Sequence, residues 1–246
     1  MKKKLFAEFL GTFILCYLGC GAAILNSNVP VAGPLIFVFL IVGLATGFGH
    51  ISGAQLNPSV SLAFLLTKQM TIKDFFLYVI FQNLGALSGF FCLYRLLSSL
   101  NDGKVTDLAC NGYGELSPLK ISVIDAFFFE FFITCFFVYV ILTNCKKENA
   151  GFIIAFTIGC ISFCAGKLTG GSMNPARSLA PALIMGGTAL KQVWLFILAP
   201  LCGAANAAFL YKMLNCECKK VEKEEKDEKD TELVELNSKE NSICIK

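Results

Sequence analysis

The chain has 246 residues, of which 55% are hydrophobic and only 16% are charged, and its mean hydropathy is +0.65. Soluble globular proteins carry about 25% charged residues, so this composition argues against secreted enzymes, nucleic-acid-binding proteins and disordered regulators. The charge is also unevenly placed, because the last 32 residues hold ten of the eighteen acidic and seven of the twenty-one basic residues. A membrane protein is the class that fits these numbers.

Six segments of the first 214 residues are apolar enough to lie in a bilayer. An α-helix needs about 20 residues to cross the ~30 Å hydrocarbon core. We therefore predict an all-α, multi-pass membrane protein with six transmembrane helices, of which the fifth needs the residues after it to reach the surface. The six segments are 5–25, 35–53, 75–97, 121–142, 151–165 and 193–214.

The distribution of lysines predicts the orientation. Six spans place both termini on one side, and lysines gather in the loops of that side, which the positive-inside rule makes cytoplasmic. We expect the protein to lie in the plasma membrane. The lysines are Lys2, Lys3, Lys4, Lys68, Lys73, Lys146, Lys147, Lys219 and Lys220.

A charged tail follows the predicted transmembrane domain of residues 1–214. Residues 215–246 are too charged to form a core and are predicted to be a disordered cytoplasmic extension. Cys216 and Cys218 lie just inside the membrane and are candidates for S-palmitoylation, with the unmodified thiol as the alternative.

An internal repeat covers most of the membrane part. Residues 50–63 align without gaps with residues 167–180, at an offset of 117. The two copies extend over about 5–97 and 121–214 and contain three spans each. Since an odd number of spans inverts the second copy relative to the first, the sequence predicts an inverted 3+3 repeat.

Each copy contains an asparagine followed by proline, at Asn57 and Asn174, before an apolar stretch of about ten residues. Asparagine is a favourable N-cap and proline a favourable first helical residue, so each pair should begin a short helix. Ten residues reach about 15 Å, half the bilayer. We predict two re-entrant half-helices whose N-termini meet near the midplane. Irregular backbone at that depth, in 49–56 and 166–173, should line a cavity or be buried in protein.

Over residues 5–214 the chain resembles the aquaporins and aquaglyceroporins of the major intrinsic protein superfamily. The resemblance implies a homotetramer with one pore in each subunit, which conducts water and small neutral solutes such as glycerol and urea passively. It implies no enzymatic activity, no metal or other cofactor, and no nucleic-acid partner. The paired Asn-Pro-Ala boxes of the family are Asn57-Pro58-Ser59 and Asn174-Pro175-Ala176.

Two glutamates, Glu8 and Glu130, match those in the first and fourth helices of the family. Their symmetric placement favours a structural role as hydrogen-bond acceptors for the re-entrant segments, whereas the alternative is a proton-coupling acid. The chain departs from the family at Ser59, where alanine is usual, and at Gln55, where a pore-facing histidine is usual.

The parts of the predicted pore also predict its chemistry. Two facing positive helix ends and the amides of Asn57 and Asn174 favour an oxygen acceptor at the centre and repel cations, hydronium included. Arg177 follows the second box, where it adds a fixed positive charge near the outer constriction.

The resemblance places four residues in an outer selectivity filter by their offsets from the boxes: Phe37, Ser162, Gly171 and Arg177. Water-selective members usually have histidine at the place of Ser162, so Ser162 and Gly171 should leave a wider gap. An apolar wall from Phe37 and a polar wall from Arg177 and Ser162 suit the two edges of a polyol. The combination resembles the insect glycerol-permeable branch of the family.

Three alternatives stay open at this point. Ser178 and Ala182, after the arginine, match water channels and favour an orthodox water-selective aquaporin. A secondary transporter would also have broken helices, but acids would be expected near the breaks, and neither Asn-Pro segment has one. A structural membrane protein with an occluded pore is the third alternative, although no bulky residue fills the filter.

Overall fold

The computed structural model describes the backbone of residues 1–29 and 31–243 and the side chains of residues 1–29 and 31–215. The chain divides into two compact units, Met1–Ala208 and Phe209–Lys246. The packing, the cavity and the site described below all belong to the first unit.

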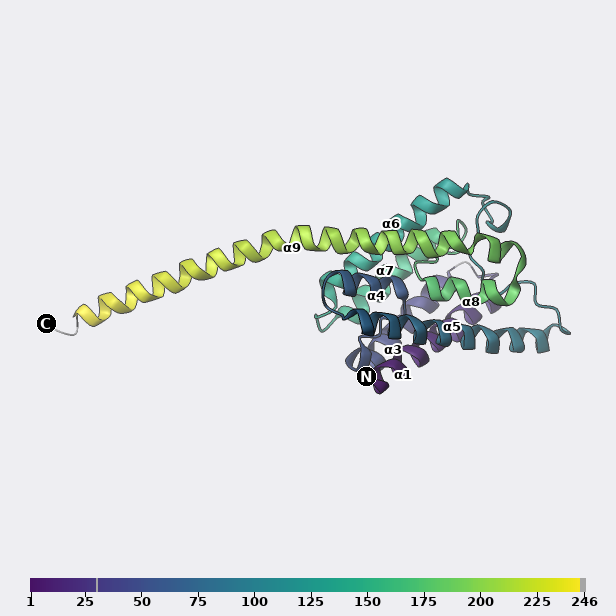
Figure 1. The fold of residues 1–246 in the computed structure, drawn as a ribbon, viewed down its shortest axis with the longest axis horizontal. Helices are drawn as coiled ribbons and strands as arrows, with labels where there is room; N and C mark the ends of the chain where they lie inside the picture. Colours follow the sequence, from purple (N-terminus) through teal and green to yellow (C-terminus); the bar gives the residue numbers. More distant parts are fainter. Residues whose placement is uncertain (30, 244–246) are drawn as a thin grey trace. The chain divides into compact units, whose positions relative to one another are not determined.

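Every regular element in the described residues is helical (Figure 1). In the first repeat, α1 (Lys2–Ile14) continues through a π-helical turn, η1 (Leu15–Cys20), into α2 (Gly21–Leu25), followed by α3 (Ala32–Ser52), α4 (Pro58–Leu66) and α5 (Ile72–Leu100). The connecting loop contains a short 3₁₀ turn, η2 (Gly114–Leu116). The second repeat comprises α6 (Val123–Asn144), α7 (Ala150–Ala165), α8 (Pro175–Met185) and α9 (Gly187–Ile243).

Five helical segments in the described residues are long and apolar enough to cross a membrane, and α7 is a shorter apolar helix of 16 residues. With the nine-residue α4 and the eleven-residue α8, they give the predicted fold class of six spans and two half-helices. Because α4 and α8 are too short to cross a membrane, each begins inside the protein, and the two helices contact each other there.

Two boundaries differ from the sequence expectation. The irregular segment before α4 begins at Gly53 rather than at residue 49, because Gly53, with a φ of 90°, ends α3 in the left-handed conformation. The backbone of α9 continues to Ile243, where a disordered tail was expected from residue 215. Lysine and glutamate, abundant there, are good helix formers. The side chains of Cys216 and Cys218 lie outside the described residues, so their lipidation stays a prediction.

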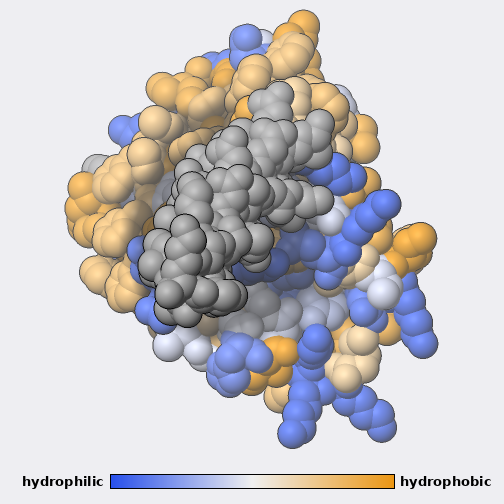
Figure 2. Space-filling model, turned by 90° about the vertical axis from the view of Figure 1, so that its left-hand side faces the viewer, coloured by the Kyte–Doolittle hydropathy of each residue, from blue (hydrophilic) through white to orange (hydrophobic). Residues whose placement is uncertain are grey.

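Large apolar side chains cover the outer surface of the unit. Phe39, Phe132 and Phe156 are 72%, 63% and 64% exposed. Contiguous apolar surface of this kind fits a hydrocarbon environment and not water. Figure 2 shows one end of the molecule, where hydrophobic residues lie along the upper and left edges and hydrophilic residues gather at the right and below.

Two glycines at corresponding places in the repeats bring helices into backbone contact. A Cβ atom at Gly85 of α5 would collide with the carbonyl oxygen of Phe9 in α1, and one at Gly203 of α9 would collide with that of Phe131 in α6. The obstacle is backbone in both cases, so it cannot rotate away. These positions therefore require glycine.

We expect Gly85→Ala to lower the free energy of unfolding by about 1–3 kcal/mol, the usual cost of overpacking. The matched control is Gly47→Ala in α3, where a Cβ would meet nothing within 4 Å and alanine is the better helix former. Thermal unfolding in detergent should show a lower midpoint for the first variant and an equal or higher one for the second. Equal midpoints for both variants would contradict the close approach of α1 and α5.

Candidate functional site

The two box asparagines cap the half-helices and tie them to each other. Oδ1 of Asn57 accepts from the backbone N–H of Ser59 at 2.8 Å, and Oδ1 of Asn174 accepts from that of Ala176 at 3.1 Å. With each oxygen engaged in its own helix, each amide nitrogen is free to donate elsewhere. Pro58 and Pro175, at the first helical positions, have no backbone N–H group and therefore need no acceptor.

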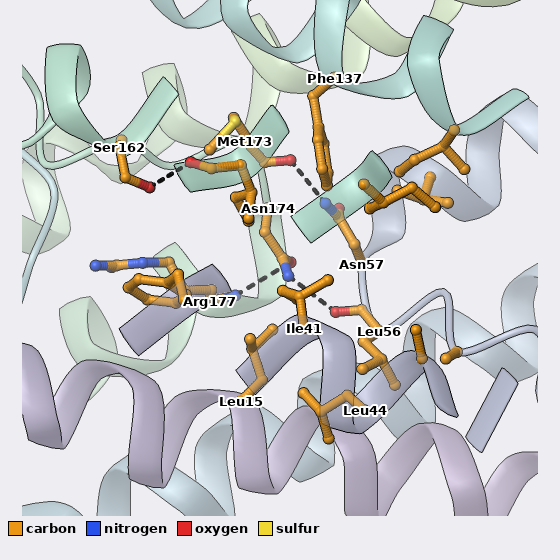
Figure 3. Close-up of a pocket in the computed structure, with 18 of the residues that line it drawn as sticks. Leu15, Ile41, Leu44, Leu56, Asn57, Phe137, Ser162, Met173, Asn174 and Arg177 are labelled. Carbon is orange, nitrogen blue, oxygen red and sulfur yellow. Dashed lines mark hydrogen bonds between the residues drawn. The ribbon is translucent and has the colours of Figure 1, made fainter. Parts of the chain in front are cut away.

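The amide nitrogens donate across the junction of the two half-helices (Figure 3). Nδ2 of Asn57 donates to the carbonyl of Met173 at 2.9 Å, and Nδ2 of Asn174 donates to the carbonyl of Leu56 at 2.8 Å. An amide nitrogen has two protons, so each asparagine keeps one donor for a molecule in the adjoining cavity.

Glu8 holds the irregular segment of the first repeat. Its carboxylate accepts from the backbone N–H groups of Gln55 (3.0 Å) and Leu56 (2.7 Å) and from the hydroxyl of Ser52 (2.6 Å). The side chain of Glu8 is completely buried. The segment contains residues with unfavourable left-handed backbone, such as Leu56 at a φ of 51°, and the carboxylate supplies the acceptors that this conformation needs.

Glu130 makes the corresponding contacts in the second repeat. It accepts from the backbone N–H groups of Ser172 (2.9 Å) and Met173 (3.1 Å) and from the hydroxyl of Thr169, and it is also completely buried. Every partner given by the structure donates to the carboxylate. This geometry fits the structural role predicted from the symmetric placement of the two acids.

A cavity of about 1030 Å³ is lined by the two asparagines. Its lining extends from Ser27 and Asp107, in loops of one face, to Lys146 and Lys147, in the loop between α6 and α7. Carbonyl groups of both irregular segments accept no hydrogen bond from any residue that the structure describes. They are acceptors available to a solute and belong to Gly53, Ala54, Gln55, Gly170, Gly171 and Ser172.

All four predicted filter residues line this cavity. Phe37 comes from α3, Ser162 from α7, Gly171 from the irregular segment and Arg177 from α8. The hydroxyl of Ser162 donates to the carbonyl of Ile158 at 2.7 Å, so Ser162 offers only oxygen lone pairs to the cavity. Figure 3 shows Ser162 and Arg177 toward one end of the pocket and the asparagines nearer its centre.

The backbone makes glycine necessary at position 171. Gly171 has a φ of 59°, and a Cβ atom there would lie 2.8 Å from the Cβ of Ala165. Any larger residue would therefore be strained and would crowd the end of α7. The width of the cavity beside Arg177 follows from this requirement.

Arg177 is held by the long loop between the repeats, a contact that no sequence pattern predicts. Its Nη1 donates to the carbonyl of Ala109 at 2.7 Å and to Oδ1 of Asn111 at 2.9 Å. Asn111 is in turn fixed by the hydroxyl of Ser178 and the carbonyl of Thr169. The loop occurs once in the chain, so the repeat alignment carries no signal for it.

Cys110 lies between these two loop residues and lines the cavity. Burial raises the pKa of the Cys110 thiol to about 11, although the nearby Arg177 opposes the shift. The thiol is therefore neutral at pH 7 and adds no negative charge beside Arg177.

The serine that departs from the family box does not line the cavity. Ser59 is completely buried, and its hydroxyl has no hydrogen-bond partner among the described residues. Ala176, its counterpart in the second box, is buried in an apolar cluster with Phe90 and Leu93. The first box thus contains a buried hydroxyl group that makes no hydrogen bond with the described residues around it.

We expect Ser59→Ala to leave stability unchanged or to raise it by up to about 1–2 kcal/mol, because it removes a buried hydroxyl without a partner. Thermal unfolding in detergent is the measurement. Ser52→Ala is the contrasting variant, since its hydroxyl donates to Glu8, and it should lower the midpoint. A lower midpoint for Ser59→Ala would mean that the hydroxyl has a partner.

The chain is similar in sequence and in fold to known proteins. The family model described as "Major intrinsic protein" matches residues 1–211. The chain belongs to the major intrinsic protein family. Relatives include Aquaporin Z of Rhodopseudomonas palustris, 36% identical over 87% of this chain and 94% of its own length, and Aquaporin Z of Brucella melitensis, 38% identical over 87% and 98%.

Another relative is the glycerol uptake facilitator protein-like 6 of Lactiplantibacillus plantarum, which is 36% identical over 87% of this chain and 99% of its own length. The solved structure of the aquaglyceroporin from Plasmodium falciparum shares the fold, with a TM-score of 0.75 at 23% identity over 89% of this chain and 99% of that one. This major intrinsic protein is therefore a multi-pass membrane protein with the fold of that family.

Proposed function

We propose that this major intrinsic protein is a passive channel for water and for small uncharged solutes such as glycerol and urea. The observation that carries the proposal is one continuous cavity that is lined by both box asparagines and by carbonyl groups without a hydrogen-bond donor among the described residues. Asparagine donors and carbonyl acceptors together replace the hydrogen bonds that a solute loses on leaving water. The names of the relatives, which include aquaporins and a glycerol uptake facilitator-like protein, support the same function.

The solute range follows from the four residues proposed as the selectivity filter. Arg177 keeps further N–H donors beside those used by the loop, and Ser162 offers an acceptor on its side of the cavity. A hydroxyl group of a solute both donates and accepts, so it can bind the N–H groups of Arg177 and the oxygen of Ser162. Gly171 adds no side chain, which leaves room for the carbon edge of a polyol against Phe37.

Ions and protons are excluded in this proposal by electrostatics. The N-termini of α4 and α8 meet beside the cavity, and each carries a partial positive charge. Arg177 adds a full positive charge, and its side-chain hydrogen bonds in the described residues go to a carbonyl and an amide oxygen rather than to a carboxylate. A cation in the cavity therefore meets the charge of Arg177 near one end and the partial positive charges of both helix ends near the asparagines.

Osmotic and isotonic uptake measurements on the same vesicles test the function. Vesicles with the protein should shrink faster than protein-free vesicles in a sucrose gradient, with a low activation energy, and should swell in isotonic glycerol. Their ionic conductance should equal that of protein-free vesicles. Equal water permeability with and without protein would rule out a channel and favour an occluded, structural membrane protein.

A water-selective channel is the second candidate function. It is favoured by Ser178, whose hydroxyl helps to fix Asn111 and through it Arg177, and by the Aquaporin Z relatives. Vesicles that pass water and exclude glycerol would establish this candidate and would show that the four filter residues are assigned wrongly.

The assembly and orientation are also proposals. We infer a homotetramer in the plasma membrane with both termini cytoplasmic. The cytoplasmic placement of the termini is supported by the exposed lysines at the start of α1 and in the loops before α5 and α7. The mass of the purified protein in detergent tests the tetramer. A tag before Lys2 should react with an antibody only in permeabilised cells, and reaction in intact cells would reverse the orientation.

A further inference from the structure

The side chain of Gln55 lies in the half of the cavity next to α4, and its oxygen is fixed by a buried chain of hydrogen bonds. Ser61 Oγ donates to Oε1 of Gln55 at 2.7 Å. Nε2 of Gln82 donates to Ser61 Oγ at 3.0 Å and to the Glu8 carboxylate at 2.8 Å. Glu8, Ser61 and Gln82 are all completely buried, so the contacts among these three side chains are shielded from water.

The chemistry of Glu8 determines the direction of this chain. The carboxylate accepts from its three other contacts and cannot donate, so the side of the Gln82 amide that faces it must be the nitrogen. The oxygen of Gln82 is buried without a partner, which shows that the contact with Glu8 decides how the amide lies. Ser61 has one proton, and because its lone pair accepts from Gln82, that proton is left for Gln55.

The nitrogen of Gln55 therefore faces the cavity. Nε2 has no acceptor among the described residues, and it is not one of the buried polar atoms without a partner. Gln55 is half-buried and lines the cavity. Free carbonyl groups of Gly53 and Ala54 lie next to it in the chain. This part of the pore thus offers N–H donors beside carbonyl acceptors.

The second repeat has no equivalent of this donor. Ser172 is the residue at the offset of 117, and it is 3% exposed. Its hydroxyl is engaged with Ser178 at 2.6 Å and with the carbonyl of Phe196 at 3.3 Å. In α9, where Gly203 corresponds to Gly85, Pro200 stands at the place of Gln82, so the chain of contacts from the buried acid is also missing there.

We propose that Gln55 is a specificity-determining residue for polyols, in which Ser61 fixes the amide so that its N–H groups project into the pore as a permanent donor station. This inference rests on the proposed channel function. Ser61 acts through Gln55 and is a positioning residue. The station is separate from the filter residues beside Arg177 and acts in the other half of the pore.

The donor matters more for a polyol than for water. A water molecule in single file turns freely and receives hydrogen bonds from the waters before and behind it. The hydroxyl oxygens of glycerol are held by one carbon chain, so each of them can accept only from a donor on the pore wall directly beside it. Loss of a wall donor therefore raises the barrier for glycerol more than the barrier for water.

Gln55→Met tests the station, because methionine keeps the length and removes the donor. Water and glycerol permeability are measured in the same vesicles and divided by the amount of protein. We expect glycerol permeability to fall about three- to tenfold, the effect of one hydrogen bond, and water permeability to fall less than about twofold. The control is Asn83→Leu in α5, whose amide donates to Val79 of its own helix and to no other residue that the structure describes, and it should change neither value.

Ser61→Ala tests the positioning role. It frees the Gln55 amide to turn, so glycerol permeability should fall by about twofold while water permeability stays constant. The double variant should conduct glycerol no more slowly than Gln55→Met alone, since both changes act on one donor. A purely structural role for Ser61 would lower both permeabilities together through the amount of folded protein.

Two results would overturn the inference. An unchanged ratio of glycerol to water permeability in Gln55→Met would do so while leaving the proposed channel function intact. Wild-type vesicles that conduct neither solute would overturn the function and the inference together. Additive effects of Ser61→Ala and Gln55→Met would remove the positioning role of Ser61 alone.

Discussion

Replacing Ser162 with histidine is expected to reduce glycerol permeability by at least about tenfold, which corresponds to ~1.4 kcal/mol in the barrier. Ser162 lines the cavity, as Arg177 does, and its own hydroxyl is turned back to the carbonyl of Ile158. An imidazole ring would extend past that position into the gap left open beside Gly171. Water needs only a single file, so its permeability should fall by less than about threefold.

The control for this variant places the same ring on the same helix but away from the cavity. Cys164 is exposed on α7 and does not line the cavity, so Cys164→His should leave both permeabilities close to those of the wild type. Stopped-flow light scattering on one set of vesicles gives both values. If Ser162→His lowers water and glycerol permeability by the same factor, Ser162 is not a size filter.

Glu130→Ala is expected to lower the free energy of unfolding by at least about 3 kcal/mol, because it leaves three buried donors without an acceptor at about 1–3 kcal/mol each. Two of these donors are backbone N–H groups, of Ser172 and Met173, that no rotamer change can redirect. The irregular segment that carries Gly171 should lose its conformation, and water permeability should fall with the amount of folded protein.

The matched control is the exposed acid Glu115, whose only ion pair is with Lys120 at 3.5 Å among the described residues. Surface pairs contribute at most about 1 kcal/mol, so Glu115→Ala should shift the unfolding midpoint little. Thermal unfolding in detergent, followed by size-exclusion chromatography, separates the two variants. Similar midpoints would show that Glu130 does not hold the segment.

Much of the fold could be predicted because its signals are local or repeated. Apolar segments of about 20 residues indicate spans wherever they fold, and the Asn-Pro pairs combine an N-cap with a favourable first residue, so α4 and α8 begin at Pro58 and Pro175 as expected. The repeat at an offset of 117 shows that the two halves correspond. It also leads to the matching roles of Glu8 and Glu130.

The sequence alone thus determined the class of protein, the inverted repeat and the residues at which the half-helices begin. Only the tertiary structure decided that each asparagine donates to the opposite segment, that Asn111 holds Arg177, and that Ser61 turns the Gln55 amide. Hydrophobic periodicity and helix caps act within a few residues and are visible in order along the chain. These contacts depend on groups dozens of residues away in the chain, including Gln82 for the direction of Ser61. Whether such groups come within hydrogen-bond distance is set only when the helices pack.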